Sequence, residues 1–337
     1  MDSINLSNNQ NELKKVKSHY ILKRIFDNIQ NKRVLYIIKY NKYIQKKLNL
    51  SILFYKEYSE IYTPIEIEII PLENQNNKFI NIKETEESYY HIYFNDNQEE
   101  IKRNYIEKND KVKNIRIIID YKVLSFQGLF KDCKCIQSIN FKKFYRNNID
   151  DMSYMFSGCS SLKKIDFSTF YNNAVKDISF MFSECPLLEE INLSNFKTNN
   201  VSKMKGLFSG CSSLRELDLS NFNTYNVIDM SNMFFLCSSL KELNLSNFNT
   251  HYLTNVNCMF FGCSKLKNLD ISNFTFDKLK YLNGMFYTCS SLKELNISNF
   301  KINDEASING MFLGCSNELK MELKTKYKNI DDRVFSL

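Results

Sequence analysis

The sequence predicts an α/β repeat solenoid, in which short strands form a parallel ladder with short helices between them, preceded by a small helical and β-rich region. Two observations carry this prediction. A block of sequence returns at a fixed step of 26 residues. Within each block, an alternating apolar pattern is followed by apolar residues spaced at three and four. The 337 residues are 43% hydrophobic, which is enough apolar material for a continuous core.

The fixed step is clearest in the motif Met/Leu-Phe-x-x-Cys. Its cysteines are Cys133, Cys159, Cys185, Cys211, Cys237, Cys263, Cys289 and Cys315. No insertion interrupts the series, so all units share one register. Such internal repetition is the sequence signature of a stacked repeat architecture.

A single unit shows the expected elements. In residues 240–266, Leu243 and Leu245 alternate with polar residues, which predicts a short strand. After a turn-like stretch, Val256 and Met259 recur at helical spacing, which predicts one or two helical turns. One unit cannot bury its own apolar side, so neighbouring units are expected to stack and bury a common core.

Each apolar position then becomes a column through the stack. One expected core column comprises Phe156, Phe182, Phe208, Phe234, Phe260 and Phe286, and another comprises Phe144, Phe170, Phe196, Phe222, Phe248, Phe274 and Phe300. The repeat cysteines form a third column, because a buried cysteine packs as a small apolar residue.

The repeat MSxMFxxCSSLxxLxLSNFxT resembles the BspA-like leucine-rich-repeat family, with Met-Phe-x-x-Cys in place of that family's Ala-Phe-x-x-Cys. The resemblance covers about Val123 to Cys315. It implies a leucine-rich-repeat-like fold of the type found in bacterial surface lipoproteins and in many protist proteins of unknown function. Ordinary leucine-rich repeats have asparagine where Phe248 stands, whereas here Asn247 comes one residue earlier. Whether an asparagine ladder forms is therefore left open.

A polar face is expected along the strand ladder. Its residues flank the central apolar residue of each strand, so they should project from the same side of successive strands. They are Lys164, Asp166, Glu190, Asn192, Glu216, Asp218, Glu242, Asn244, Asp270, Glu294 and Asn296. A solvated sheet face is the plain interpretation, a calcium site is a weaker one, and a protein-binding surface is the functional hypothesis.

No catalytic, metal or cofactor site is expected. Zinc needs ligands clustered in tetrahedral geometry, whereas the repeat cysteines stand in a line. His19, His91 and His251 lie far apart in the sequence. The chain contains none of the common motifs for a serine hydrolase, a zinc peptidase or a phosphate-binding loop. We therefore expect a protein that is not an enzyme.

The N-terminal region is basic. Asn11–Glu60 holds twelve Lys and Arg against four Asp and Glu, whereas the whole chain has a net charge of +7. Ile21, Ile25 and Ile29 lie on one helical stripe, which predicts amphipathic helices with a basic outer face. Such helices could contact an acidic partner or a membrane surface. The spacing of their hydrophobic residues also resembles that of the F-box motif, but the Leu-Pro pair that usually opens this motif is missing.

The expected order of regions is a disordered polar tail at 1–17, basic helices at 18–60, a β-rich region at 61–120 that shields the open end of the stack, the repeats at 121–316 and a C-terminal cap at 317–337. Strands are expected around Ile65, Ile67 and Ile69, at Tyr89–Phe94 and at Ile115–Ile119. No signal peptide or membrane-spanning stretch is seen, so a cytoplasmic location is expected, with the cell surface as the alternative that the resemblance implies.

These patterns predict a non-enzymatic scaffold that binds one or more proteins through its repeat surface, and no nucleic acid. Two alternatives remain open. One is a surface or adhesion protein, as the family resemblance implies. The other is an F-box-like substrate adaptor of a ubiquitin ligase.

Overall fold

The computed structural model describes residues 41–47, 63–73, 76–276, 278–297, 302–303, 305–327 and 330–336. The chain divides into two compact units, Met1–Pro64 with Asp120–Lys122, and Ile65–Ile119 with Val123–Leu337. In the first unit, helix α4 (Lys42–Lys47) lies within the predicted basic helices, and the side chain of Asn41 accepts a hydrogen bond from the Ile44 amide at 3.2 Å. The predicted polar tail, and the predicted basic helices apart from residues 41–47, lie outside the described residues.

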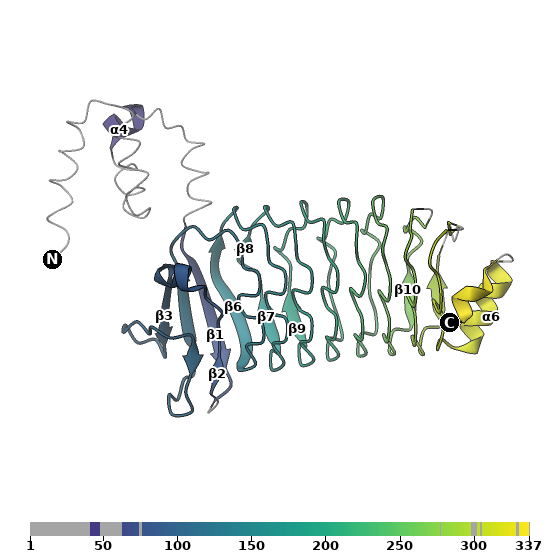
Figure 1. Cartoon of the computed structure of the whole chain (residues 1–337), viewed down its shortest axis with the longest axis horizontal. Coiled ribbons are helices and arrows are strands. Elements are labelled where there is room, and N and C mark those ends of the chain that lie inside the picture. Colours follow the sequence, from purple (N-terminus) through teal and green to yellow (C-terminus); the bar gives the residue numbers. More distant parts are fainter. Residues whose placement is uncertain are drawn as a thin grey trace. The chain divides into compact units, whose positions relative to one another are not determined.

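The second unit begins with an antiparallel sheet. It contains β1 (Ile65–Pro71), β3 (Tyr90–Phe94) and β5 (Ile115–Ile119), which confirm the three predicted strands. A separate short pair joins β2 (Asn77–Lys78) to β4 (Tyr105–Ile106), and the 3-10 helix η1 spans Glu84–Tyr89. The order β3-β5-β1-β6-β7-β9 carries the sheet from these strands directly into the repeats (Figure 1).

Within the repeats the strand ladder is parallel but interrupted. β6 (Ile136–Tyr145) pairs with β7 (Lys164–Asp166) and with β8 (Phe170–Tyr171), and β7 pairs with β9 (Glu190–Asn192). Further along, β10 (Asn268–Asp270) pairs with β11 (Glu294–Asn296). Residues 216–218 and 242–244, which lie between these groups, are not strands.

The charge pattern gives a physical reason for this interruption. Paired strands bring like charges into direct opposition, which destabilises the pairing. Continuous pairing would place Glu190, Glu216 and Glu242 at successive positions of one column. Asn268 ends this run of glutamates and pairs with Glu294, although it does not pair with Glu242 on its other side.

The prediction of a short helix in each repeat is wrong for the residues that the structure describes. These segments are runs of turns, in which the Met259 amide donates to the Val256 carbonyl and the Cys263 amide to the Phe260 carbonyl, each three residues back. The Phe260 amide donates instead to the Met285 carbonyl of the next repeat, at 2.9 Å. The apolar spacing of three and four therefore arises from consecutive turns that bond to the neighbouring repeat.

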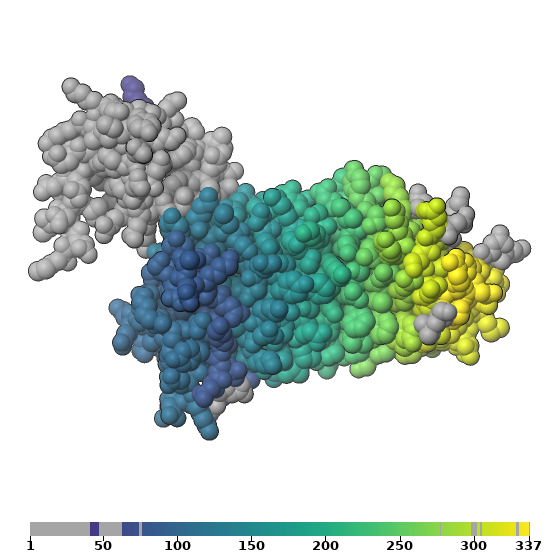
Figure 2. Space-filling model, viewed as in Figure 1, coloured from purple at the N-terminus to yellow at the C-terminus, as the bar shows by residue number. Residues whose placement is uncertain are grey.

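The predicted core columns are confirmed where they are described. The rings of Phe156, Phe182, Phe208, Phe234, Phe260, Phe286 and Phe312 stack in sequence with centroids 5.3–5.9 Å apart and interplanar angles of 3–11°. Each of these rings is at most 1% exposed. Successive repeats pack against one another along the second unit, as the unbroken run of colours in Figure 2 shows.

An asparagine ladder is present, one residue earlier than in ordinary leucine-rich repeats. The Asn247 amide group donates to the carbonyls of Leu219 at 2.9 Å and Phe222 at 2.8 Å, in the preceding repeat. The amide group of Asn273 makes the equivalent bonds one repeat later. The shift is possible because the aromatic column occupies the interior position next to the asparagine.

The last repeat is followed by helix α6 (Asn317–Lys326) and the 3-10 helix η2 (Asp332–Phe335). The Ser316 hydroxyl accepts a hydrogen bond from the Leu319 amide and caps α6. The Val334 carbonyl accepts from the Phe312 amide at 2.7 Å, and the Phe335 ring lies 5.9 Å from that of Phe312. The last ring of the aromatic column is therefore covered, not exposed.

Two columns of the turns hold residues in the left-handed region. One runs from Gly128 through Phe180 and Gly206 to Gly310, and every member has a φ between 53 and 63°. A right-handed helix cannot contain this conformation, which explains the turns. Large side chains in the column need a glycine beside them. A Cβ added to Gly206 would lie 2.3 Å from the Phe180 ring.

We predict that Gly206→Ala destabilises the protein more than Gly128→Ala. Both residues have a positive φ near 60°, but a Cβ at Gly128 would meet its nearest atom at 3.7 Å. The extra cost at Gly206 should be about 1–3 kcal/mol of overpacking, measured as free energy of unfolding in urea. The double variant Phe180→Ala/Gly206→Ala should recover most of that extra cost. Equal losses in the two single variants would contradict the packing of Phe180 over Gly206.

Candidate partner-binding face

The polar strand face forms as the alternation predicts. In each rung an apolar residue turns inward, for example Ile165 at 1% exposed and Leu269 at 3% exposed, and its two neighbours face outward. Register brings equivalent positions together, so Lys164 lies opposite Glu190 and Asp270 opposite Asn296. Ten of the eleven predicted face residues are exposed, and Asp166 is half-buried.

The Asp and Asn column of this face has a structural role. From Asp166 to Asp270, each of these side chains accepts a hydrogen bond from the backbone amide two residues later, as in Ser220 to Asp218 at 2.9 Å and Ser246 to Asn244 at 3.0 Å. Asparagine amides also donate along the stack, from Asn296 to Asp270 at 3.1 Å. Alternation of Asp with Asn therefore replaces charge repulsion by hydrogen bonds.

Hydrogen bonding holds these carboxylates in their charged form. The backbone amide and hydroxyl of Ser220 lower the pKa of Asp218. The hydroxyl and amide of Ser272, together with Asn296, lower the pKa of Asp270. Both side chains are thus anions at neutral pH, and their negative charge belongs permanently to the face.

A groove opens on this face, over the unpaired rungs at 216–218 and 242–244 and over the paired strands β10 and β11. It has a volume of about 1060 Å³ and spans the rungs from 216 to 296. Its lining includes five carboxylates, from Glu216, Asp218, Glu242, Asp270 and Glu294, and no lysine or arginine. The groove floor is apolar, formed by Leu217, Leu243, Leu245 and Leu269.

The predicted face residues separate into two groups. Glu216, Asp218, Glu242, Asn244, Asp270, Glu294 and Asn296 line the groove, whereas Lys164, Asp166, Glu190 and Asn192 do not. The latter form a paired stretch of sheet, in which Lys164 contacts Glu190 at 2.6 Å and Asn192 donates to Asp166 at 3.1 Å. Sequence reasoning missed the polar lining residues Ser246, Asn268, Ser272 and Asn273, although Asn268 follows from the same column as Glu242.

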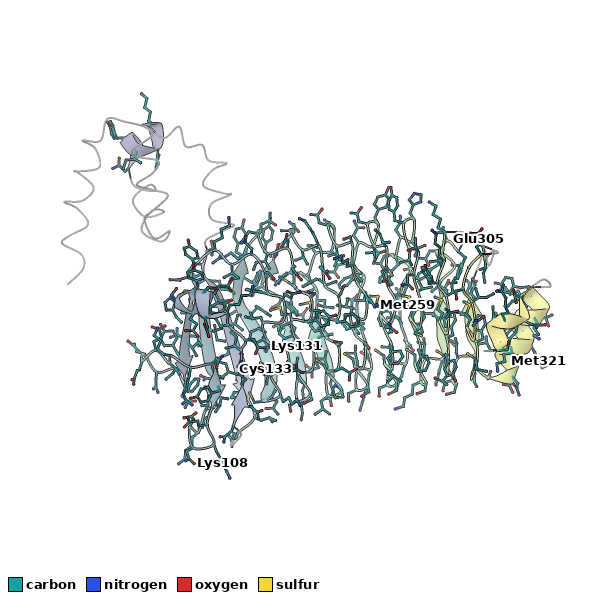
Figure 3. The ribbon with its side chains drawn as sticks, in the orientation of Figure 1. Lys108, Lys131, Cys133, Met259, Glu305 and Met321 are labelled. Carbon is teal, nitrogen blue, oxygen red and sulfur yellow. The ribbon has the colours of Figure 1, made fainter. Side chains whose placement is uncertain are left out.

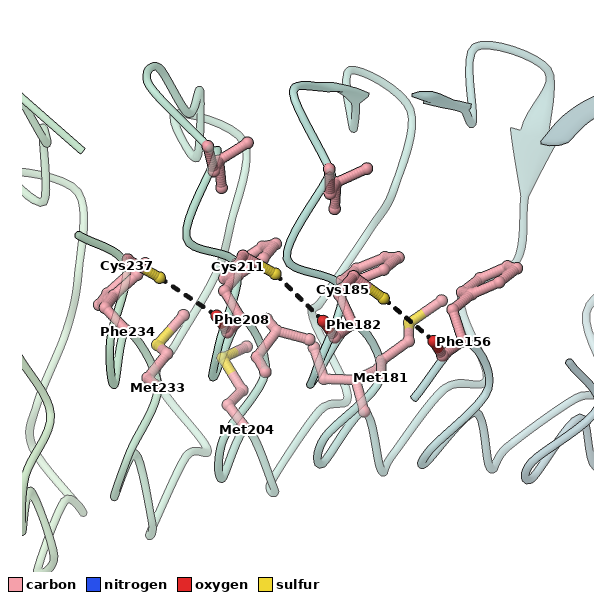
Figure 4. Close-up of a cluster of buried hydrophobic side chains, with 14 of the residues drawn as sticks. Phe156, Met181, Phe182, Cys185, Met204, Phe208, Cys211, Met233, Phe234 and Cys237 are labelled. Atoms are coloured by element: carbon pink, nitrogen blue, oxygen red, sulfur yellow. Dashed lines mark hydrogen bonds between the residues drawn. The ribbon is translucent and has the colours of Figure 1, made fainter. Parts of the chain in front are cut away.

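The cysteine column lies in the core, as predicted, and it is hydrogen-bonded. The thiol of Cys185 donates to the Phe156 carbonyl, that of Cys211 to Phe182 and that of Cys237 to Phe208, each at 3.1 Å (Figure 4). The carbonyls of Phe156 and Phe208 also accept a turn hydrogen bond from the backbone amide of their own repeat's cysteine, Cys159 and Cys211. The thiol therefore satisfies the second lone pair of a buried carbonyl, which an apolar side chain would leave unbonded.

In the part of the chain that the structure describes, no group of three or more His, Cys, Asp and Glu residues is arranged to hold a metal ion. Over the same residues, no helix has the length and apolar character needed to cross a membrane.

Comparison with known families identifies the repeats. The family described as "Mycoplasma protein of unknown function, DUF285" matches residues 124–241 and 212–325, which together cover more than half of the chain. The family described as "BspA type Leucine rich repeat region (6 copies)" matches residues 54–168. The chain belongs to the DUF285 family, and its repeats are of the BspA leucine-rich type.

Among solved structures, this DUF285 chain matches a leucine-rich cell surface protein from Faecalibacterium prausnitzii A2-165, with 17% sequence identity and a TM-score of 0.28. The match covers 56% of this chain and 42% of that protein, so the chain spans less than half of its length. A TM-score of this size does not establish a shared fold. No curated protein matches the chain.

We predict that the BspA-type repeats lose stability in alkaline solution. Burial raises the pKa of Cys185 and of Cys237 from 9.0 to about 12, because the thiolate is unfavourable in the core. A raised folded-state pKa contributes stability that is fully present below pH 9 and is lost as the pH rises toward 12. Unfolding midpoints measured across this range should fall. Cys237→Ala should fall less steeply, and a flat profile for the natural chain would contradict the buried column.

Proposed function

We propose that this chain is a non-enzymatic interaction scaffold of the solenoid type, which binds an extended protein segment rich in Lys and Arg on its polar strand face. The observation that carries the proposal is the groove. It joins five carboxylates to an apolar leucine floor and has no cation in its lining. A binding site with apolar contacts and a few fixed charges of one sign suits a partner that brings the opposite charge.

The interrupted ladder supports this choice of site. In the paired rungs, Lys164 neutralises Glu190 within the face itself. In the groove, Glu216 and Glu242 form no ion pair with a described residue, so their charge is available to a partner. Lysine side chains suit such a site, because their aliphatic stems can cover the leucine floor while the ammonium group reaches a carboxylate.

We predict that the double variant Glu216→Lys/Glu242→Lys loses partners that the natural chain retains. Affinity purification with quantitative mass spectrometry should show this loss, and added salt should mimic it. Thermal stability should change by no more than about 0.5 kcal/mol, because both side chains are exposed. Glu322→Lys, an exposed change on α6, is the matched control. Partners bound equally by all three proteins would rule out the groove as the site.

A second proposal concerns location. The comparisons do not support the cytoplasmic location expected from the sequence, and the BspA-type repeats agree better with the alternative of a surface protein. We therefore propose that the scaffold acts at a cell surface. The possible role of the N-terminal helices in binding an acidic partner, a membrane surface or a ubiquitin ligase stays a prediction.

Surface exposure has a direct test. Protease added to intact cells should remove the chain, whereas a cytoplasmic control protein should remain. The expected cleavage sites lie in exposed turns, such as the one that contains Tyr225. Complete protection of the chain in intact cells, with cleavage after lysis, would return the location to the cytoplasm.

A further inference from the structure

One edge of the repeat stack is a row of four-residue turns. In these turns the Val201 amide donates to the Thr198 carbonyl at 3.0 Å, and the Leu253 amide to the Thr250 carbonyl at 3.1 Å. Figure 3 marks this edge with Glu305, which is exposed in the turn of the last repeat, where the Ala306 amide donates to the Asn303 carbonyl at 2.9 Å. The two central residues of each turn are the most outward. In the early repeats they include Asn199 and Asn200, a residue type that suits such turns.

Two consecutive repeats carry exposed aromatic residues at these positions instead. Tyr225 replaces the first asparagine in one repeat, and His251 with Tyr252 replaces both in the next. The rings of Tyr225 and His251 are parallel, with centroids 6.1 Å apart. The Tyr252 ring stands across both, 5.3 Å from Tyr225 and 4.7 Å from His251. Contacts among the three rings hold them as a cluster, although Tyr225 is 44% exposed and Tyr252 is 47% exposed.

Other repeats of the stack hold non-aromatic residues at these positions, and Tyr252 lacks a bond that several members of its column make. At the second central position, Asn200 donates to the Asn173 carbonyl at 2.7 Å and Asn226 to the Asn199 carbonyl at 3.0 Å. Lys278, one repeat after Tyr252, donates to the His251 carbonyl at 3.2 Å. Tyr252 has no amide or ammonium group with which to make this contact.

Two further exposed residues break polar columns, one in the first of these repeats and one in the repeat that follows them. Ile228 is 52% exposed, where neighbouring repeats have Ser202 and Thr254. Tyr281 is 48% exposed, where Asp229 occupies the column two repeats earlier and accepts a hydrogen bond from the Ser231 amide at 2.7 Å. We call Tyr225, Ile228, His251, Tyr252 and Tyr281 the aromatic turn patch.

Charge is distributed around this patch as at a protein interface. Its five residues carry no carboxylate or ammonium group. On the side of the earlier repeats, Lys176 contacts Asp150 at 3.5 Å and Lys203 contacts Asp177 at 3.1 Å. On the other side, Lys278 and Lys280 form no ion pair with a described residue. Protein interfaces characteristically have an aromatic, charge-depleted centre and a polar rim.

We propose that the aromatic turn patch binds a protein partner through an apolar segment flanked by carboxylates. The tyrosines and Ile228 supply the apolar centre, and Lys278 with Lys280 supply the complementary charge. A saccharide is a weaker fit, because Ile228 offers no hydrogen bond to a sugar hydroxyl. This site is separate from the acidic groove, and it selects a partner of opposite charge.

The first test uses the purified full chain and no partner. Tyr225→Asn and Tyr252→Asn replace each aromatic residue with the asparagine that the same column holds in other repeats. If the aromatic residues serve binding, the double variant should unfold at the same temperature as the natural chain or a higher one, because the asparagine introduced in place of Tyr252 can restore the missing bond. A clearly lower unfolding temperature would show that the rings are structural, and would overturn the proposal.

The second test uses a library of random peptides displayed on phage. The natural chain is the target, and Tyr225→Asn/Tyr252→Asn serves for counter-selection. Peptides that survive should combine aromatic or aliphatic residues with Asp and Glu. Their affinity for the natural chain should exceed that for the double variant by about tenfold or more, as for interface hot spots. Lys280→Glu should also weaken them, whereas Lys176→Glu, in the same column four repeats earlier, should not.

The peptides selected in the second test distinguish binding at the aromatic turn patch from binding at the groove. Basic peptides that are lost with Glu216→Lys/Glu242→Lys would report the groove alone. If they are the only class selected, the aromatic turn patch is not a peptide-binding site and the inference fails. Acidic apolar peptides that bind both chains equally would also contradict it. If acidic peptides require the tyrosines while no basic peptide requires the groove, this inference stands and the proposed function of the groove falls.

Discussion

Each repeat of this protein relies on its neighbours for the hydrogen bonds of its own backbone. The Phe156 amide donates to the Met181 carbonyl of the next repeat, and the same bond recurs at Phe182, Phe208, Phe234, Phe260 and Phe286. A repeat taken alone would therefore leave buried backbone groups unbonded, at a cost that its own apolar contacts cannot offset. This constraint keeps the bonded segments of successive repeats in one register, in agreement with the constant step of 26 residues.

The same constraint decides which residues fill the interior. A buried carbonyl such as that of Phe208 accepts one bond from the Cys211 amide in its own turn, and its second lone pair faces the next repeat. The thiol of Cys237 fits this space and donates to it at 3.1 Å. A larger side chain would clash, and alanine would leave the lone pair unbonded. Cysteine is thus used as a small core residue with one weak donor.

Both candidate binding surfaces, the acidic groove and the aromatic turn patch, lie where the regular pattern of the repeats changes. The acidic groove spans the rungs where glutamates recur in one column and strand pairing is interrupted, and it continues over the paired strands β10 and β11. Where aromatic residues replace turn asparagines, an apolar patch stands at the edge of the stack. Residues that recur in every repeat stabilise the stack. Residues that differ from the rest of their column are therefore the ones that indicate function. Each repeat can be compared directly with its neighbours, because the same backbone position occurs several times in one molecule.

By itself the sequence determined the repeat, its register, the inward columns and the outward polar face, because burial follows directly from apolar periodicity. It also predicted the strands at Ile65–Ile69 and Ile115–Ile119 from their alternation and β-branched residues. Only the tertiary structure decided that turns replace the expected helices, because a spacing of three and four fits both. The deciding facts are the positive φ of residues such as Phe180 and the bonds to the next repeat, which no local pattern contains. The division of the polar face into a paired stretch and a groove likewise depends on contacts between rungs. Sequence placed Glu190 and Glu216 in one column, but the loss of pairing between them is a property of the stack.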